Sequence, residues 1–399
     1  MKKGWQTKTL AEVCQIKPPK REAREKVSAS SLVSFLPMED LGIHVKFVQA
    51  TRTKPLSAVV GSYTYFADGD VLLAKITPCF ENGKLGIAGG LKNGIGFGSS
   101  EYIVFRPGPS VSKEWLYYFL SRETFRVEGA ARMLGAVGHK RVPKEFIEDY
   151  PLSVPPLSEQ RRIVGVLDEA FTGIATAKAN TEKNLQNARA LFESHLQSVF
   201  TQRGEGWVEK KVSEIAKHSL GKMLDKAKNK GEPQPYLRNI NVRWFTFDLS
   251  DLLQMPFLPT EAGKYTAIKG DVLICEGGYP GRAAIWDEDY PIYFQKALHR
   301  VRFHQPEHNK WFVYYLSVQD SSGQLKQHFS GTGIQHFTGE VLARFTIPVP
   351  LLPELRRTVA KFDALSQETQ RLARLYERKL AALDGMKKSL LHQAFNGDL

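Results

Sequence analysis

Two tracts of this chain repeat each other over the length of a long helix. The segment 154–164 (VPPLSEQRRIV) returns 195 positions later as segment 349–359 (VPLLPELRRTV). The same offset still holds far downstream, where Phe200 corresponds to Phe395. No insertion or deletion interrupts either copy, which is what a rigid helix imposes and a loop does not. The repeat therefore predicts two rods of equal length.

Both tracts carry the apolar period of an amphipathic helix. Positions spaced alternately four and three residues apart are mostly apolar in each copy, as in a coiled-coil seam. They are Leu365, Thr369, Leu372, Tyr376, Lys379, Leu383, Met386 and Leu390 in the second copy, and Ile163, Leu167, Ala170, Ile174 and Ala177 in the first. Ser158 and Pro353 stand where an N-cap or first-turn residue belongs, with Glu159 and Glu354 beside the positive helix end. Two such stripes most simply cover each other by packing antiparallel.

The segments before these helices also correspond, although small insertions and deletions separate them. Gly4-Trp5 matches Gly206-Trp207, and the run 69–72 (GDVL) matches 270–273. Short apolar runs between Gly, Pro and Asn predict strands, and 115–121 and 311–317 predict short helices. The expected fold is therefore α+β, with two globular domains joined by two long helices packed as an antiparallel coiled coil, in a pseudo-twofold internal repeat. The expected divisions are a first domain at 1–157, a central helix at 158–203, a second domain at 204–352 and a C-terminal helix at 353–399.

Composition narrows the class of function. The net charge of +13 favours a polyanionic partner, because Lys and Arg that neutralise phosphates release counterions. No apolar run is long enough for a membrane span, and the N-terminus lacks the apolar core of a secretory signal. Three cysteines far apart predict neither disulfides nor a thiolate metal site, which fits a cytoplasmic protein. The sequence contains no P-loop, H-E-x-x-H or G-x-S-x-G motif, so no catalytic set is recognisable.

The repeated helix start, the Gly-Trp domain starts, the paired GDVL strands and the ending Phe395-Asn396-Gly397 resemble the DNA-specificity subunits of type I restriction-modification enzymes. The resemblance covers essentially the whole chain. One departure is Glu354-Leu355, where the family usually has Glu-Gln. The resemblance implies two target-recognition domains, each reading one half of a bipartite double-stranded DNA site, and two helices that fix the gap between the halves.

The resemblance also implies partners that carry out the chemistry. These are two methyltransferase subunits, which use S-adenosylmethionine, and restriction-translocase subunits, which use ATP and Mg²⁺. The chain itself is expected to be non-catalytic and to bind none of these cofactors and no metal. The helix starts are the expected contacts with partner subunits, through Glu159, Gln160, Arg161, Arg162, Glu354, Arg356 and Arg357.

Two pairs of corresponding loops are the candidate DNA contacts. One pair follows the GDVL strands and the other precedes the strands that lead into the long helices. The candidates are Lys75, Thr77, Lys84, His139, Lys140 and Arg141 in the first domain, and Gly278, Tyr279, Arg282, Gln335 and His336 in the second. Arg and Gln can read guanine and adenine through paired hydrogen bonds, while Lys reaches phosphate and Gly permits close backbone approach. Solvated turns explain the same residues without DNA.

Two other functions fit the same sequence less completely. A DNA-binding scaffold of unrelated role would lack methyltransferase partners, and a cryptic nucleic-acid enzyme would turn over a substrate alone.

Overall fold

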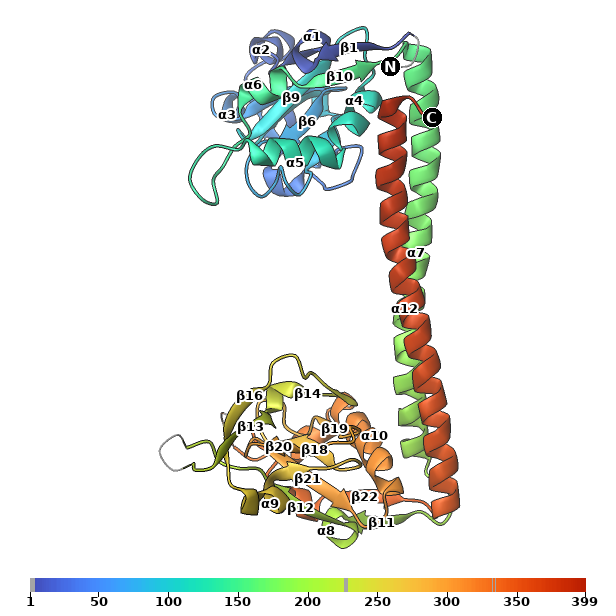
Figure 1. The fold of residues 1–399 in the computed structure, drawn as a ribbon. Helices are drawn as coiled ribbons and strands as arrows, with labels where there is room; N and C mark the ends of the chain where they lie inside the picture. Colours follow the sequence, from blue (N-terminus) through green and yellow to red (C-terminus); the bar gives the residue numbers. More distant parts are fainter. Residues whose placement is uncertain (1–3, 226–228, 332, 334) are drawn as a thin grey trace. The chain divides into compact units, whose positions relative to one another are not determined.

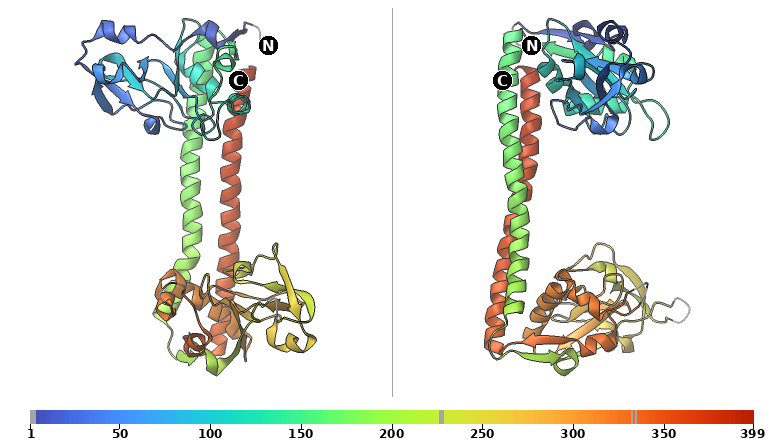
Figure 2. Two further views of the ribbon diagram at one scale, coloured as in Figure 1. Left: turned by 90° about the vertical axis from the view of Figure 1, so that its left-hand side faces the viewer. Right: turned by 180° about the vertical axis from the view of Figure 1, so that it is seen from behind.

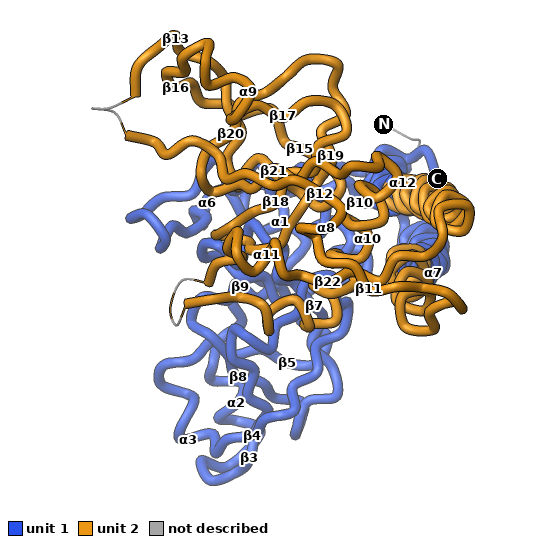
Figure 3. The backbone as a smooth tube through the Cα atoms, turned by 90° about the horizontal axis from the view of Figure 1, so that it is seen from below, with its two compact units in different colours: residues 1–182, 378–399 blue, residues 183–377 orange. Residues whose placement is uncertain are grey.

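The computed structural model describes residues 4–225, 229–331, 333 and 335–399, and it divides into two compact units. Unit 1 consists of residues 1–182 and 378–399, and unit 2 of residues 183–377 (Figure 3). Each unit thus combines one globular domain with part of each long helix. The long helices are α7 (Leu157–Gln202) and α12 (Leu352–Asn396) (Figure 1).

The globular part of unit 1 contains three small sheets. The first has the strand order β2 (Cys14–Ile16), β9 (Tyr102–Pro107), β6 (Val71–Ala74), β7 (Leu85–Ile87). The second runs β4 (Arg52–Pro55), β3 (Leu32–Leu36), β8 (Ile95–Gly98), β5 (Thr64–Ala67), and the third pairs β1 (Gln6–Thr9) with β10 (Pro151–Val154). All neighbours are antiparallel except β3 and β8, which are parallel. Short helices surround these sheets: α1 (Leu10–Val13), α2 (Arg21–Lys26), α3 (Leu56–Val59), α4 (Lys113–Leu120), α5 (Glu123–Ala131) and α6 (Lys144–Glu148).

Unit 2 repeats the three sheets strand for strand. They are β12 (Ala216–Leu220), β21 (Leu298–Phe303), β18 (Val272–Cys275), β19 (Ala283–Ile285); then β16 (Leu253–Phe257), β13 (Glu232–Leu237), β20 (Ile292–Phe294), β17 (Thr266–Ala267); and β11 (Val208–Lys211) with β22 (Thr346–Val349). The parallel pair recurs as β13 and β20. Unit 2 adds a hairpin of β14 (Val242–Arg243) and β15 (Thr246–Phe247). Its helices are α8 (Val212–Ile215), α9 (Ala262–Tyr265), α10 (Glu307–Ser321) and α11 (Gly339–Arg344). The predicted α+β repeat is confirmed.

The repeated Gly-Asp dipeptides have a structural cause. Gly69 and Gly270 have φ values of 91° and 92°, which glycine adopts without the steric penalty of a side chain. The following Asp70 is buried and accepts two hydrogen bonds from the Arg106 guanidinium, at 2.8 and 2.9 Å. In unit 2 Asp271 accepts the same pair from Arg302, at 2.7 and 2.6 Å. Each dipeptide therefore fixes the start of a central strand, β6 or β18.

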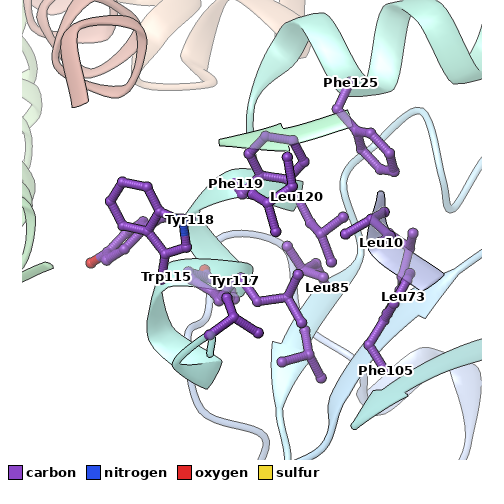
Figure 4. Close-up of a cluster of buried hydrophobic side chains, with 14 of the residues drawn as sticks. Leu10, Leu73, Leu85, Phe105, Trp115, Tyr117, Tyr118, Phe119, Leu120 and Phe125 are labelled. Carbon is purple, nitrogen blue, oxygen red and sulfur yellow. The ribbon is translucent and has the colours of Figure 1, made fainter. Parts of the chain in front are cut away.

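Both long helices contribute to the apolar core of each unit. In unit 1, Trp115 and Phe119 of α4 lie in one buried cluster with Leu167 of α7 and Phe395 of α12 (Figure 4 shows the side chains of α4). In unit 2 a corresponding cluster contains Trp311 of α10, Phe200 of α7 and Phe362 of α12. The globular domains are therefore built onto the helices rather than tethered to them.

A matching polar anchor joins each domain to one helix. Asp168 of α7 accepts hydrogen bonds from the Tyr118 hydroxyl and from Lys46 Nζ, the latter at 2.6 Å. Asp363 of α12 accepts them from the Tyr314 hydroxyl (2.7 Å) and Lys310 Nζ (2.6 Å). Burial, together with these bonds, raises the pKa of both tyrosine hydroxyls well above the usual range, so both act as donors. The aspartates kept in register by the repeat thus have the same task in both units.

The two long helices are antiparallel, as predicted. In unit 1 Lys178 of α7 forms an ion pair with Asp384 of α12 at 2.7 Å, and in unit 2 Arg189 pairs with Glu377 at 2.8 Å. Moving forward along α7 therefore means moving backward along α12, and Figure 2 shows the two helices side by side.

The seam of α12 departs from the predicted stripe in its second half. Met386 is 55% exposed and Lys379 is also exposed, whereas Leu380 and Lys387 are partly buried beside the partner helix. Burial lowers the pKa of Lys387, whose Nζ lies 5.3 Å from the centre of the Phe171 ring. A helix with 3.6 residues per turn drifts by about 20° per heptad against a strict seven-residue repeat. After two to three heptads this drift moves the seam to the next residue.

Candidate nucleic-acid interface

The two candidate loops of unit 1 lie side by side. The segment after β6 is joined to the segment before α6 by two backbone hydrogen bonds, which together form an antiparallel bridge. Thr77 N–H donates to Lys140 O at 2.9 Å, and Val142 N–H donates to Lys75 O at 3.0 Å. Ile76 and Arg141 form an antiparallel bridge between them. Loops separated by more than 60 positions in the sequence therefore form one surface.

Three of the candidate side chains in unit 1 have partners within the chain. Lys75 Nζ donates to Ser100 O at 3.1 Å, and the Thr77 hydroxyl donates to Glu81 at 2.7 Å. Lys84 is partly buried, and its Nζ donates to Met38 O at 2.7 Å, which joins the β6–β7 loop to the second sheet. Lys84 thus has a structural role, while Lys75 and Thr77 remain at the edge of the loop surface.

Arg141 is held by a carboxylate. Its guanidinium donates two hydrogen bonds to Glu101, each 2.9 Å long, and a third to the His139 carbonyl at 3.1 Å. The bond from Arg141 lowers the pKa of the Glu101 carboxyl, which therefore stays ionised. These three bonds use three of the five N–H donors of the guanidinium and fix its position, so Arg141 braces the loop and keeps only its remaining donors for another partner. Sequence reasoning missed Glu101, because nothing in the primary structure marks a partner 40 positions away.

His139 and Lys140 are exposed like Arg141, but unlike Arg141 their side chains are unpaired. Neither side chain has a hydrogen bond or ion pair to any other residue in the described part of the chain. They follow the turn of a hairpin that begins at Leu134, whose backbone exchanges hydrogen bonds of 2.9 and 2.8 Å with Arg141. Of the unit 1 candidates, these two side chains are free to bind a phosphate, Lys140 through its charge and His139 through a ring N–H.

Unit 2 brings its two loops together in the same way. Phe337 N–H donates to Glu276 O at 2.7 Å, which joins the segment after β18 to the segment before α11. A Cβ placed on Gly277 would lie only 3.2 Å from Nδ1 of His336, so the loops are in direct contact. His336 is partly buried and Gln335 is exposed, while Ile334 lies outside the described residues. The paired-loop surface is therefore a feature of both units.

The loop after β18 is rigid around Gly278. This glycine has a φ of 79°, and a Cβ there would lie 2.3 Å from the Asn239 side chain, so no other residue fits. The Asn239 side-chain amide donates to Gly277 O at 3.0 Å. The Asn239 backbone carbonyl accepts a hydrogen bond from the Arg282 guanidinium, also at 3.0 Å. The Arg282 guanidinium stacks on the Tyr279 ring at 4.2 Å, and Tyr279 is 66% exposed. Tyr279 is thus a fixed aromatic surface that Arg282 supports from one face.

The helix starts show which predicted partner contacts are accessible. Leu157 and Leu352 begin α7 and α12, so Ser158 and Pro353 lie in the first turns as predicted. Arg161 and Arg357 are exposed, and Arg162 is exposed in an ion pair with Glu159 at 2.8 Å. Arg356 pairs with Glu307 at 2.5 Å, and Glu354 accepts from the Trp207 indole N–H at 3.0 Å.

Gln160 contradicts the prediction for the helix start. Its side chain is fully buried, accepts from Ser112 N–H at 2.8 Å, and donates to Ser110 O and Pro155 O at 2.9 and 2.8 Å. A buried amide whose donors and acceptor are satisfied within the chain offers nothing to a partner. Gln160 instead fixes the segment before α4 onto the start of α7.

Other classes of site find little support in the described residues. Those residues contain no cluster of three His, Cys, Asp or Glu side chains able to hold a metal ion. None of the described helices is long and apolar enough to cross a membrane.

Comparison with known proteins agrees with this geometry. The sequence profile of the type I restriction modification DNA specificity domain matches residues 2–187 and again residues 204–377, which together make up most of the chain. This chain belongs to the type I restriction-modification DNA specificity family.

Relatives of known role share parts of the chain. The specificity subunit of the Escherichia coli enzyme EcoAI is 34% identical over 219 residues, which is 54% of this chain and 35% of that protein. The EcoEI specificity subunit, also from Escherichia coli, is 38% identical over 167 residues, or 42% of this chain and 27% of that protein. These matches span about a third of the curated relatives' length.

Two solved structures share the fold over the whole chain. The HsdS subunit from Thermoanaerobacter tengcongensis superposes with a TM-score of 0.71 at 19% identity, covering 100% of this chain and 98% of that one. A chain from a study of complex assembly and conformational transition of the type I R-M system gives 0.80, also at 19% identity, covering 100% and 99%. Both solved structures thus share this arrangement of duplicated domains and paired helices.

Proposed function

We propose that this chain is the DNA-specificity subunit of a type I restriction-modification enzyme and reads a bipartite site for partners that perform the chemistry. The observation that carries the proposal is the duplicated loop surface. Each unit repeats the same three sheets and brings the same two loops together, and the chain has a net charge of +13. A single chain with two similar but non-identical readers suits a split, asymmetric DNA sequence.

Within this proposal the sequence divides by task. Residues 1–157 and 204–352 each read one half-site, and residues 158–203 and 353–399 form the spacer that sets the gap between the halves. The shared cores and the Asp168 and Asp363 anchors support a fixed attachment of each domain to the helices. The free thiols Cys14, Cys79 and Cys275 suit the reducing cytoplasm, where the genome lies.

The candidate contacts fall into four roles. His139 and Lys140 bind phosphate, because both are exposed hydrogen-bond donors without a partner in the described chain, and Lys140 is charged. Gln335 and the Tyr279 ring meet base edges, and Gly278 lets the backbone approach closely. Lys84, Arg141 and Arg282 hold the loops in place through Met38, Glu101 and Asn239. Lys75, Thr77 and His336 complete the surface at the junction between loops.

The chemistry belongs to the partner subunits. We propose that two methyltransferase subunits dock on the helix starts, where Arg161, Arg162, Arg356 and Arg357 are exposed, and that restriction-translocase subunits join the assembly. S-adenosylmethionine, ATP and Mg²⁺ bind to those partners. This chain binds no cofactor and no metal of its own.

Methylation mapping in cells tests the proposal. The chain is expressed together with the methyltransferase subunits of its host, and methylated adenines are mapped genome-wide. We expect one split sequence with a constant gap, and no methylation when this chain is omitted or when the purified chain is given S-adenosylmethionine alone. A DNA scaffold of unrelated role would produce no methylation in the co-expression, and an enzyme would act without partners. Either result overturns the proposal.

A matched pair of variants tests the loop surface. The double variant H139A/K140A removes the two unpaired side chains and one lysine charge, and Lys92→Ala removes the charge of another exposed lysine, just before β8. Each phosphate charge neutralised contributes about −0.9 to the slope of log affinity against log salt. The double variant should reduce the magnitude of this slope by about one such increment on all sequences, and the control should not. Equal effects of both would show that only net charge matters.

A further inference from the structure

The hairpin of unit 1 that precedes α6 ends in an exposed apolar tip. Its turn, Ala136 to His139, is closed by the His139 N–H donating to Ala136 O at 2.9 Å. Gly135 and Gly138 flank the tip with φ values of 122° and 81°, so the chain reverses over small residues only. Val137, at the tip, is 93% exposed, more than any other large hydrophobic residue in the described chain.

The base of the hairpin is held by several bonds, so the tip projects from a defined position on the domain. The Leu134–Arg141 pair closes its base, Thr77 N–H binds Lys140 O at 2.9 Å, and Glu101 holds the Arg141 guanidinium. A single exposed valine needs no explanation by itself. A valine at the tip of a loop closed by an antiparallel bridge, with the unpaired side chains of His139 and Lys140 two and three residues after it, is placed for contact with a polyanion that has apolar groups between its charges.

Double-stranded DNA has that character in its major groove. This groove is about 12 Å wide and has room for two adjacent chain segments such as those of this loop, whereas the minor groove, about 6 Å wide, does not. The apolar group that base pairs present in the major groove is the C5-methyl of thymine. Phosphates line both edges of the groove, within reach of cations beside the tip.

We propose that Val137 contacts the methyl group of one thymine in the half-site read by unit 1, while His139 and Lys140 bind the flanking phosphates. The inference rests on the proposed function and adds to it a residue that selects thymine without a hydrogen bond. The alternative is an apolar wedge pushed between base steps in the minor groove, which typically uses Phe, Leu, Ile, Met or Pro. The short Val137 side chain between glycines favours the methyl contact.

Replacing thymine by deoxyuridine tests the contact, because it removes only the methyl group. The full chain, assembled with its methyltransferase subunits, is bound to duplexes carrying the mapped site with one thymine replaced at a time. We expect one thymine, in one half-site only, at which deoxyuridine weakens binding about fourfold, equivalent to about 0.8 kcal/mol for one buried carbon group. In the Val137→Ser variant this ratio falls to about one.

The matched control is Val127→Ser, which makes the same chemical change at an exposed valine of α5. It should keep the fourfold ratio. The inference is overturned if no thymine is sensitive, if the site has no thymine in either half, or if Val137→Ser keeps the ratio. A wedge would lower the affinity of Val137→Ser on all duplexes and leave the ratio unchanged. Loss of specific binding to the unsubstituted duplex by the wild-type complex would instead overturn the proposed function.

Discussion

Unit 2 should lose stability in mild acid through one buried histidine, His299. This residue lies on β21 with 2% of its surface exposed, and neither ring nitrogen has a hydrogen-bond partner among the described residues. Burial, with a smaller contribution from repulsion by His218, lowers the pKa of His299 to about 4. The two rings lie 6.3 Å apart, centre to centre. The folded unit therefore holds His299 neutral.

The size and direction of the effect follow from proton linkage. In the unfolded chain a histidine has a pKa of about 6.5. Between that pH and about pH 4 the unfolded state therefore binds a proton at this residue and the folded state does not. The contribution of His299 is fully present above about pH 6.5 and is lost as the pH falls toward 4. The maximum loss is about 3 kcal/mol, and between pH 7.5 and pH 5.0 it is about 2 kcal/mol.

Urea unfolding followed by hydrogen-exchange mass spectrometry measures the effect, because peptides from β18 and β21 report on unit 2 separately from unit 1. Carboxylates also titrate below pH 5, so the informative quantity is the difference between wild type and His299→Leu. The variant should lose about 2 kcal/mol less between pH 7.5 and pH 5.0. The exposed His304, changed to Leu, should behave like wild type. An equal pH dependence in wild type and His299→Leu refutes the reasoning.

Three further predictions concern the site, the spacer and the strand starts. If Arg141 braces the hairpin through Glu101, Arg141→Ala and Glu101→Ala should weaken DNA binding equally, and the double variant should weaken it no further. If Arg141 instead reads a base, only Arg141→Ala should reduce the preference for one base at one position, by about 1–3 kcal/mol, and a binding-site selection would show this. Inserting four residues after Lys178 and four before Asp384 lengthens both helices by about 6 Å. Methylation mapping should then find the same half-sites separated by a gap up to about two base pairs longer. An unchanged gap contradicts the spacer role. Asp70→Asn should lower the free energy of unfolding by about 3 kcal/mol in calorimetry, because it breaks a buried pair with Arg106. Asp289→Asn, in the exposed pair with Lys269, should have a much smaller effect.

The architecture was predictable because the sequence pattern of one domain and one long helix occurs twice in the chain. The constant offset of 195 residues could only come from two helices without insertions, and the structure has them at Leu157–Gln202 and Leu352–Asn396. The seam of α12 was less predictable. A strict heptad places Met386 in it, but a nearly straight helix accumulates rotation and exposes Met386 in favour of Lys387.

The loop surfaces were predictable as regions but not in detail. Corresponding positions in the repeat marked the loops, yet their contact depends on backbone pairing such as Thr77 with Lys140. The roles of single side chains depend on partners far away in sequence. Arg141 looks like a base-reading residue until Glu101 is placed beside it, and Lys84 looks like a phosphate contact until the Met38 carbonyl is. A sequence lists the donors, and only the fold shows which are already used.

Leu355, which stands where the family usually has Gln, is also explained by contacts with residues far away in the sequence. In unit 1 Gln160 enters the domain and satisfies backbone groups of Ser110 and Ser112, which precede α4. Its counterpart Leu355 is equally buried but apolar, and in unit 2 the helix α10 already begins at Glu307. Because that segment is helical in unit 2, a Gln side chain at position 355 would lack free backbone groups to bind. Each buried polar group left without a hydrogen bond costs about 1–3 kcal/mol. The presence of Leu rather than Gln at position 355 is therefore explained by the different structure of the segment about 50 residues earlier. It does not require a different partner subunit.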